Sequence, residues 1–111
     1  MYICCIYVRV DEKYCYQGQV FEWDLEKAAA NLLKHGVSFE KASEIFFDPF
    51  VCVVDATDEG VQAREAAIGF SVDLKMLYVV HVIREGSGIE SIRIISARAA
   101  TSRERSHYEN Q

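Results

Sequence analysis

Arginines in the second half of the chain carry its most distinctive chemistry. They are Arg64, Arg84, Arg93, Arg98, Arg103 and Arg105. A guanidinium group donates paired hydrogen bonds to phosphate oxygens, so this set suits the stabilisation of charge on a phosphate. Solvated surface arginines without a function would give the same counts, and composition does not separate the two interpretations.

Several side chains could transfer protons beside these cations: His35, His81, His107, Tyr108 and several acids. Cofactor-free RNA cleavage needs this combination, because the ribose 2′-hydroxyl attacks its own phosphate while cations stabilise the charge that builds up. Each candidate also has a structural interpretation. His81 lies in the apolar run 77–83 and could be a hydrogen-bonded sheet residue, His35 could cap a helix, and Tyr108 could pack a terminal helix.

Arg93 and Arg98 differ in parity along one expected strand. Side chains of a regular strand alternate between its two faces, so these arginines would point to opposite sides of the sheet. They can join one site only if a bulge or the end of the strand lies between them.

The chain contains no motif for a metal or a nucleotide cofactor. It lacks a P-loop, a Rossmann glycine pattern, a metalloprotease helix and a G-x-S-x-G elbow. Cys4, Cys5, Cys15 and Cys52 form no zinc spacing with the histidines and are read as reduced thiols. A disulfide from Cys4 or Cys5 to Cys15 stays an alternative.

Length and charge limit the function classes. The chain has 111 residues, the length of one domain, and a net charge of −5, which argues against a general nucleic-acid binder. The charge is uneven: residues 1–63 carry −6 and residues 64–111 carry +1. An acidic first half fits a protein partner with a basic surface. The sequence contains no membrane span and no signal peptide, so we expect a cytoplasmic protein.

The elements that must position these residues predict an α+β fold. Residues 2–10 and 14–23 are typical of strands and could form a β-hairpin around the polar break 11–13. A helix is predicted over 25–35, with Asp24 as its N-cap, Gly36 as its stop and an apolar stripe of Ala29, Leu32 and Leu33.

A second helix is predicted over 39–47, capped by Ser38 and ended by Asp48-Pro49, with the apolar face Phe39, Ala42, Ile45 and Phe46. Further strands are expected at 50–54, buried on both faces, and at 62–70, 75–84 and 89–98. Their short connections indicate an antiparallel sheet of about four strands. Thr101 and Glu104 form a capping box for a polar surface helix over 102–109.

Read in order, these residues resemble the BrnT toxin family from about residue 20 to residue 109. In the first half the resemblance rests on Phe21-Glu22-Trp23-Asp24, Lys27-Ala28, Asn31, Lys34-His35-Gly36-Val37-Ser38-Phe39 and Phe47-Asp48-Pro49. In the second half it rests on Arg64, Ile68-Gly69, Ser71, Val80-His81, Arg84, Arg93-Ile94-Ile95-Ser96-Ala97-Arg98, Ala100, Glu104 and Tyr108.

The resemblance implies a small bacterial ribonuclease toxin with a RelE-like fold, which cleaves RNA without a metal and inhibits translation. It implies a BrnA-like antitoxin as partner, with DNA contacted only through that antitoxin. The candidate catalytic residues carried over are Arg64, His81, Arg84, Arg93, Arg98 and Tyr108, and Lys34 and His35 are further candidates for RNA binding. Arg64, Arg93 and Arg98 would contact phosphate, while His81 or Tyr108 would handle a proton or stack a base.

Three parts of the chain depart from the family. Leu25 stands where members usually have proline. Members typically read Asp-x-x-His-Ser and then Glu-Glu-Arg, whereas the segment 55–64 lacks His-Ser and has Gln62-Ala63 before Arg64. Residues 1–20 lie outside the match and are predicted to be an extension, with the toxin domain at 21–111. An active toxin, a weakened family member that acts as an antitoxin-binding co-repressor, and a nucleic-acid-binding module without chemistry all stay open, as does self-association.

Overall fold

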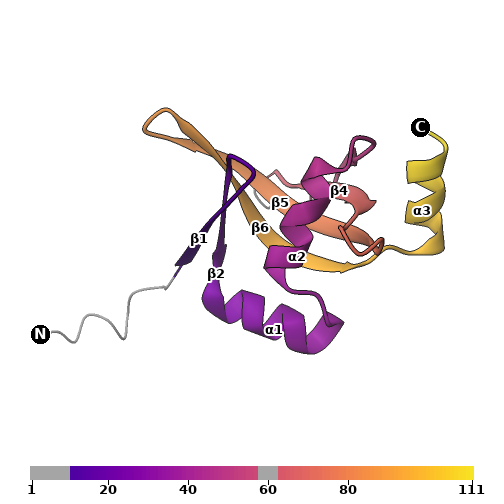
Figure 1. Cartoon of the computed structure of the whole chain (residues 1–111), viewed down its shortest axis with the longest axis horizontal. Helices are drawn as coiled ribbons and strands as arrows, with labels where there is room; N and C mark the ends of the chain where they lie inside the picture. Colours follow the sequence, from indigo (N-terminus) through magenta and orange to yellow (C-terminus); the bar gives the residue numbers. More distant parts are fainter. Residues whose placement is uncertain (1–10, 58–62) are drawn as a thin grey trace, which may run out of the picture.

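The computed structural model describes residues 11–57 and 63–111. The predicted strand 2–10, the thiols Cys4 and Cys5, and the altered residues 58–62 lie outside the described residues. The predicted α+β class is confirmed: helices pack against a mixed sheet whose described strands run in the order β1-β2-β6-β5-β4-β3 (Figure 1). No helix in the described part of the chain is long and apolar enough to cross a membrane.

The sheet has six described strands rather than about four, because the N-terminal hairpin is part of it. Strand β1 (Asp11–Tyr16) pairs antiparallel with β2 (Gln19–Asp24), and β2 pairs parallel with β6 (Ile89–Ala99). The predicted break at 11–13 is wrong. The turn lies at Gln17 and Gly18, whose φ values of 50° and 82° match the two-residue hairpin turn that suits the strand twist. The division into an extension and a domain at residue 20 stays a prediction.

The remaining strands form the predicted antiparallel series. These are β3 (Cys52–Asp55), β4 (Glu65–Phe70), β5 (Met76–Gly86) and β6, each paired with the next. The prediction that the strand near 50–54 is buried on both faces is wrong. Strand β3 ends the sheet, and Val53 is 50% exposed, because no further described strand or helix covers its outer side.

Two helices cover one face of the sheet, here called the helix face. They are α1 (Leu25–His35) and α2 (Phe39–Glu44), the latter continuing into a 3-10 turn, η2 (Ile45–Phe47). The caps are as predicted: Asp24 accepts hydrogen bonds from two backbone N–H groups of α1, Gly36 has φ 72°, and the Ser38 hydroxyl accepts from Lys41 N. The predicted inner residues of the second helix are confirmed, since Phe39, Ala42 and Ile45 are fully buried.

The apolar stripe of α1 does not face the core. Leu32 is 50% exposed and Leu33 is 91% exposed. The buried residue of this helix is Asn31, whose amide donates to Val37 O (3.0 Å) and Ala97 O (2.8 Å) and accepts from Ala97 N (3.1 Å). Helix α1 is therefore attached to β6 by the hydrogen-bonded, buried amide of Asn31, while Leu32 and Leu33 face solvent.

The opposite face, here called the back face, carries a smaller core. Cys52, Ile68 and Met76 form it together with Tyr108 of α3 (Ser102–Glu109). The predicted capping box of Thr101 and Glu104 is confirmed at the start of α3. Helix α3 lies near β4 at one end of the sheet (Figure 1), and its Tyr108 packs in the back-face core with Cys52, Ile68 and Met76.

Candidate functional site

Arg93 and Arg98 lie on the same face of the sheet because β6 contains a bulge between them. Val80 pairs with Ser96 and His81 pairs with Ile94, so Ile95 is an extra residue in β6. Arg93 is opposite Val82 and Arg98 is opposite Tyr78, and both partners have even parity on the regular strand β5. Four residues of β5 separate the two positions, which is about 13 Å at roughly 3.3 Å per residue.

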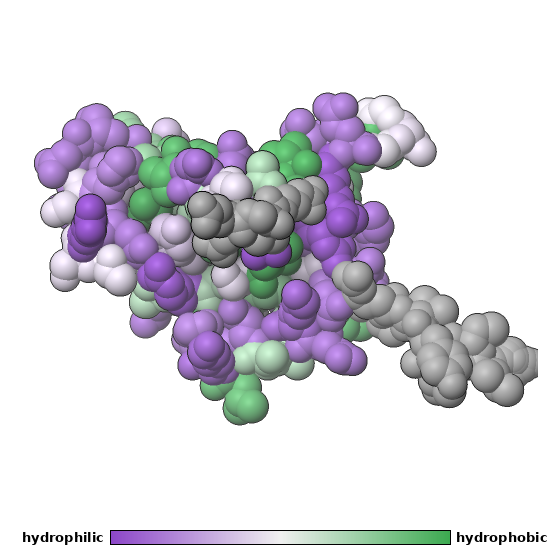
Figure 2. All heavy atoms as spheres, turned by 180° about the vertical axis from the view of Figure 1, so that it is seen from behind, coloured by the Kyte–Doolittle hydropathy of each residue, from purple (hydrophilic) through white to green (hydrophobic). Residues whose placement is uncertain are grey.

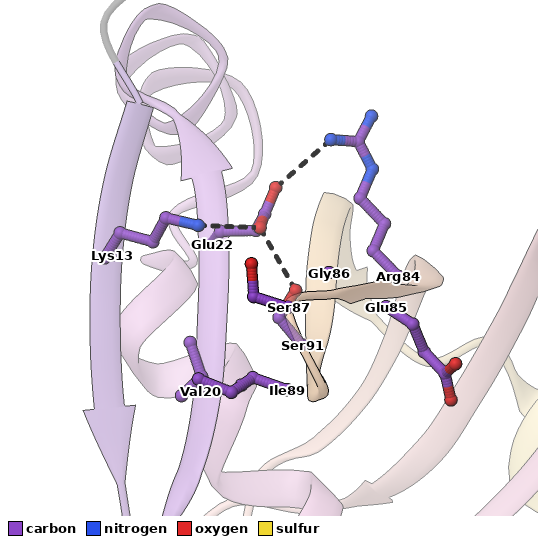
Figure 3. Close-up of a pocket in the computed structure, with 9 residues that line it drawn as sticks. All are labelled: Lys13, Val20, Glu22, Arg84, Glu85, Gly86, Ser87, Ile89 and Ser91. Atoms are coloured by element: carbon purple, nitrogen blue, oxygen red, sulfur yellow. Dashed lines mark hydrogen bonds and ion pairs between the residues drawn. The ribbon is translucent and has the colours of Figure 1, made fainter.

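Arg84 lies on this back face as well, in a pocket of about 490 Å³ near the β5–β6 hairpin (Figure 3). The register pairs Arg84 with Ser91, and Arg93 with Glu22 of β2. Glu22 Oε2 accepts from Arg93 Nη1 (2.8 Å) and Arg84 Nη1 (3.4 Å). Its Oε1 accepts from Lys13 Nζ (3.1 Å) and Ser91 Oγ (3.1 Å).

Glu22 is a fixed anion rather than a proton acceptor. Burial acts to raise its pKa, but hydrogen bonds from Arg93, Lys13 and Ser91 outweigh burial and hold the pKa below its ordinary value. Its four acceptor sites are occupied, which leaves none for a substrate proton. Arg93 is itself buried, and its second terminal nitrogen, Nη2, donates to Asp11 Oδ1 (3.2 Å). The cations that face solvent here are Arg84 and Lys13, with exposed side-chain fractions of 51% and 69%.

Arg98 is held at the other end of the back face by α3. Its guanidinium donates to both carboxylate oxygens of Glu104, each at 2.8 Å. Its Cζ also lies 4.2 Å from the centroid of the Tyr78 ring. Glu104 caps the backbone N–H of Thr101, so one carboxylate fixes both the start of α3 and the direction of Arg98. The side chain of Arg98 remains 35% exposed.

Arg64 lies just before β4 and extends its ladder, because Ala56 N donates to Arg64 O (2.9 Å). By strand alternation its side chain has the parity of Ala66, on the back face. Arg64 Nε is buried and has no hydrogen-bond partner among the described residues.

His81 lies on the helix face, away from these arginines. It is 2% exposed, packs edge-on against Phe46 with ring centroids 4.9 Å apart, and lies 3.5 Å from Glu65 Oε1 through Nε2. Its Nδ1 is 3.2 Å from Val79 O. Burial lowers the pKa of His81, although Val79 and Glu65 act in the opposite direction. This is a neutral, packed sheet histidine, and the structure does not bring it together with Arg93 or Arg98.

The other predicted site residues do not belong to the row of arginines. Tyr108 packs against Phe70 and donates to Asp48 Oδ2 (2.8 Å). Burial, followed by the bond to Asp48, raises the pKa of Tyr108 to about 12, so this phenol stays protonated at neutral pH. Lys34 and His35 are exposed in the last turn of α1, on the helix face.

Glu22 and Glu104 were not among the predicted site residues, although both organise arginines. A sequence signal exists for Glu22, since it stands between the buried Phe21 and Trp23 on a strand. A charged residue in such a strand needs a partner of opposite sign. Nothing in the sequence indicates that the partner comes from β6.

The back face thus presents cations from separate strands in one row, held by carboxylates. Such an array can bind phosphates and stabilise negative charge on them. Among the described residues, no cluster of three or more histidines, cysteines or acids could hold a metal ion.

Comparison with known proteins gives one result that bears on this surface. The sequence model of the family described as "Ribonuclease toxin, BrnT, of type II toxin-antitoxin system" matches residues 23–104. A search of curated proteins found no match. The matched range begins at the last two residues of β2, Trp23 and Asp24, and includes both helices of the helix face and the strands that carry Arg84, Arg93 and Arg98.

Proposed function

Because the chain belongs to the BrnT family of ribonuclease toxins of type II toxin-antitoxin systems, we propose that its back face binds and cleaves RNA. One observation supports this assignment most strongly: the bulge at Ile95 places Arg93 and Arg98 on one face together with Arg84. Arg64 has the same parity as the back-face residue Ala66. RNA cleavage without a metal, inhibition of translation, a RelE-like fold and a cytoplasmic location complete the proposal.

The proposed roles of the three arginines follow from the solvent exposure of their side chains. The side chains of Arg84 and Arg98 are 51% and 35% exposed and would contact substrate phosphates. Arg93 is buried between Glu22 and Asp11 and would keep the array in place. The strand spacing of about 13 Å between Arg93 and Arg98 suits an extended single strand rather than one phosphate.

Proton transfer is the weaker half of the proposed chemistry. Glu22 and Glu104 have pKa values held below the ordinary range by their arginine partners, although burial opposes this in both. His81 lies on the other face. Neither Glu22, Glu104 nor His81 is therefore both on the back face and free to accept a proton, and a positioned general base normally contributes about 10²–10⁴-fold. We expect slow cleavage whose rate rises with pH without a plateau near pH 6.5.

The test is cleavage of a defined single-stranded RNA, in the presence of EDTA, by the purified chain and by Arg84→Ala. Among the described residues, the Arg84 side chain makes one long hydrogen bond, to Glu22 (3.4 Å), so its removal should leave the fold intact. We expect a loss of about 10²-fold, the usual cost of one charge-stabilising donor. Arg105→Ala is the matched control, because Arg105 is exposed on α3 and should retain full activity. Equal activity of all three proteins would contradict the proposed surface.

A second function is supported by the ion pairs of the arginines. Arg93 and Arg98 form ion pairs with Glu22 and Glu104, as expected if these arginines stabilise the fold rather than bind a substrate. The chain would then act as an antitoxin-binding co-repressor with little activity. Expression without an antitoxin separates the two: a ribonuclease should arrest growth and the Arg84→Ala variant should not, whereas a co-repressor should be tolerated in both forms.

A further inference from the structure

The solvent-exposed side of α1 carries an apolar stripe that no described part of the chain covers. At about 100° per residue, Leu25, Ala29, Leu32 and Leu33 form one continuous stripe. Leu25 is 39% exposed, Leu32 is 50% exposed and Leu33 is 91% exposed. Asn31 occupies the inward side, so the stripe is not needed to hold the helix on the sheet. Figure 2 shows a hydrophobic protrusion at the lower edge of the molecule, where Figure 1 places α1.

The stripe borders a groove of about 300 Å³ between α1, the start of α2, and β1. Its apolar lining comes from Trp23, Leu25, Ala28, Leu32 and Phe39, among others. Apolar contacts spaced along a helix and a neighbouring groove form the geometry that accepts an amphipathic helix. Helix α1 has 11 residues, or about 16 Å at 1.5 Å per residue, which matches three turns of a partner.

The charges around this groove are acidic. Glu12 and Glu40 line it, and Glu26 lies one turn before Ala29 and two turns before Leu33 on the same side of α1. Among the described residues, none of these three carboxylates forms an ion pair. A second copy of this chain would place acids against acids, which is unfavourable. The groove fits a partner whose apolar residues are flanked by lysine or arginine.

Another exposed apolar patch serves as a comparison. Phe50, Val72 and Leu74 are 69%, 73% and 78% exposed near the β4–β5 turn. The acids there are already engaged, since Lys41 Nζ lies 2.7 Å from Asp73 Oδ2 and Glu44 Oε1 accepts a hydrogen bond from Val72 N (3.0 Å). This patch therefore offers a basic partner fewer free carboxylates than the α1 groove does.

We propose that the α1 groove is the docking site for the antitoxin, which inserts an amphipathic helix with an apolar stripe and flanking basic residues. The proposal rests on the toxin–antitoxin assignment of the chain. It places inhibition on the helix face, on the opposite side of the sheet from the arginines. The antitoxin would then act on the toxin without occupying the phosphate-binding surface with this helix.

The experiment measures the affinity of the purified chain for the antitoxin encoded in the same operon, by calorimetry. The test variant is Leu32→Ser/Leu33→Ser, and the control is Leu74→Ser, which alters a leucine that is 78% exposed and lies outside the groove. Truncation of a hot-spot residue at the centre of an interface weakens binding more than tenfold. We expect at least a tenfold loss for the α1 variant and less than a twofold change for the control.

A charge variant tests the acidic rim. Glu12→Gln/Glu40→Gln should weaken binding at low salt and reduce its dependence on ionic strength. Unchanged affinity of the α1 variant, loss of binding in Leu74→Ser, or dimerisation of the antitoxin-free chain that the α1 variant abolishes would each overturn the proposal. RNA cleavage by the free α1 variant should equal that of the parent. Absence of cleavage in both would refute the proposed function and leave the binding result intact.

Discussion

Glu22→Gln should destabilise the protein strongly, because it removes the negative charge that neutralises the buried Arg93. The side chains of Glu22 and Arg93 are each 7% exposed and lie 2.8 Å apart. Breaking one partner of a buried pair costs about 3–5 kcal/mol, since the remaining charge is left in a poorly solvated site. Asp11 still contacts Arg93 at 3.2 Å, so we expect the lower end of that range.

The size of the effect can be converted into a melting temperature. An unfolding entropy of about 2.1 cal/mol/K per residue makes 3 kcal/mol equal to a fall of about 13 °C for this chain. Urea denaturation followed by circular dichroism gives the free energy directly, provided that the m-value does not change. Lys13→Met is the matched control, because Lys13 contacts the same carboxylate but is 69% exposed. It should cost about 1 kcal/mol or less.

The loss should also depend on pH in a defined direction. The folded pKa of Glu22 is below its ordinary value of 4.5, so its ionised form stabilises the fold fully above that value. This stability is lost as the pH falls below 4.5 through the folded pKa. The difference between parent and Glu22→Gln should therefore shrink in acid. A variant that costs no more than Lys13→Met at pH 7, or a difference that grows in acid, would refute the buried-pair reasoning.

Further predictions concern the helix face. Asn31→Leu leaves Ala97 N–H and two carbonyls without partners and should cost about 3 kcal/mol in urea unfolding; a neutral result would mean that the amide does not attach α1. Gly69→Ala places a Cβ 3.1 Å from Ile45 O and should cost about 1–3 kcal/mol, seen as a lower Tm. The folded pKa of His81 lies below its ordinary 6.5, so the free energy of unfolding should fall as the pH drops below 6.5. His81→Gln should lose this pH dependence. The same pH dependence in the variant and the parent would contradict the assignment.

Local signals in the sequence determined most of the elements. Caps act within a few residues, so Asp24, Ser38 and the Thr101 box predicted the helix starts that the structure has. Short turns determined the antiparallel order of β3 to β6 for the same reason. The family was identifiable because its motifs consist of nearby residues.

Contacts between distant segments were decided by the tertiary structure. The parallel pairing of β2 with β6 joins residues about 70 positions apart, and no local pattern encodes it. The same holds for the inward side of α1, where hydrogen bonds of Asn31 to β6 outweigh a leucine stripe.

The candidate site shows this division most clearly. The amino-acid order shows that arginines are available and that Arg93 and Arg98 have opposite parity along one expected strand. Only the folded sheet decided their common face, because a bulge is a mismatch between two paired strands and depends on both. It also decided that His81 lies on the other face, since the parity of a residue becomes a direction only when one side of the sheet is covered by helices.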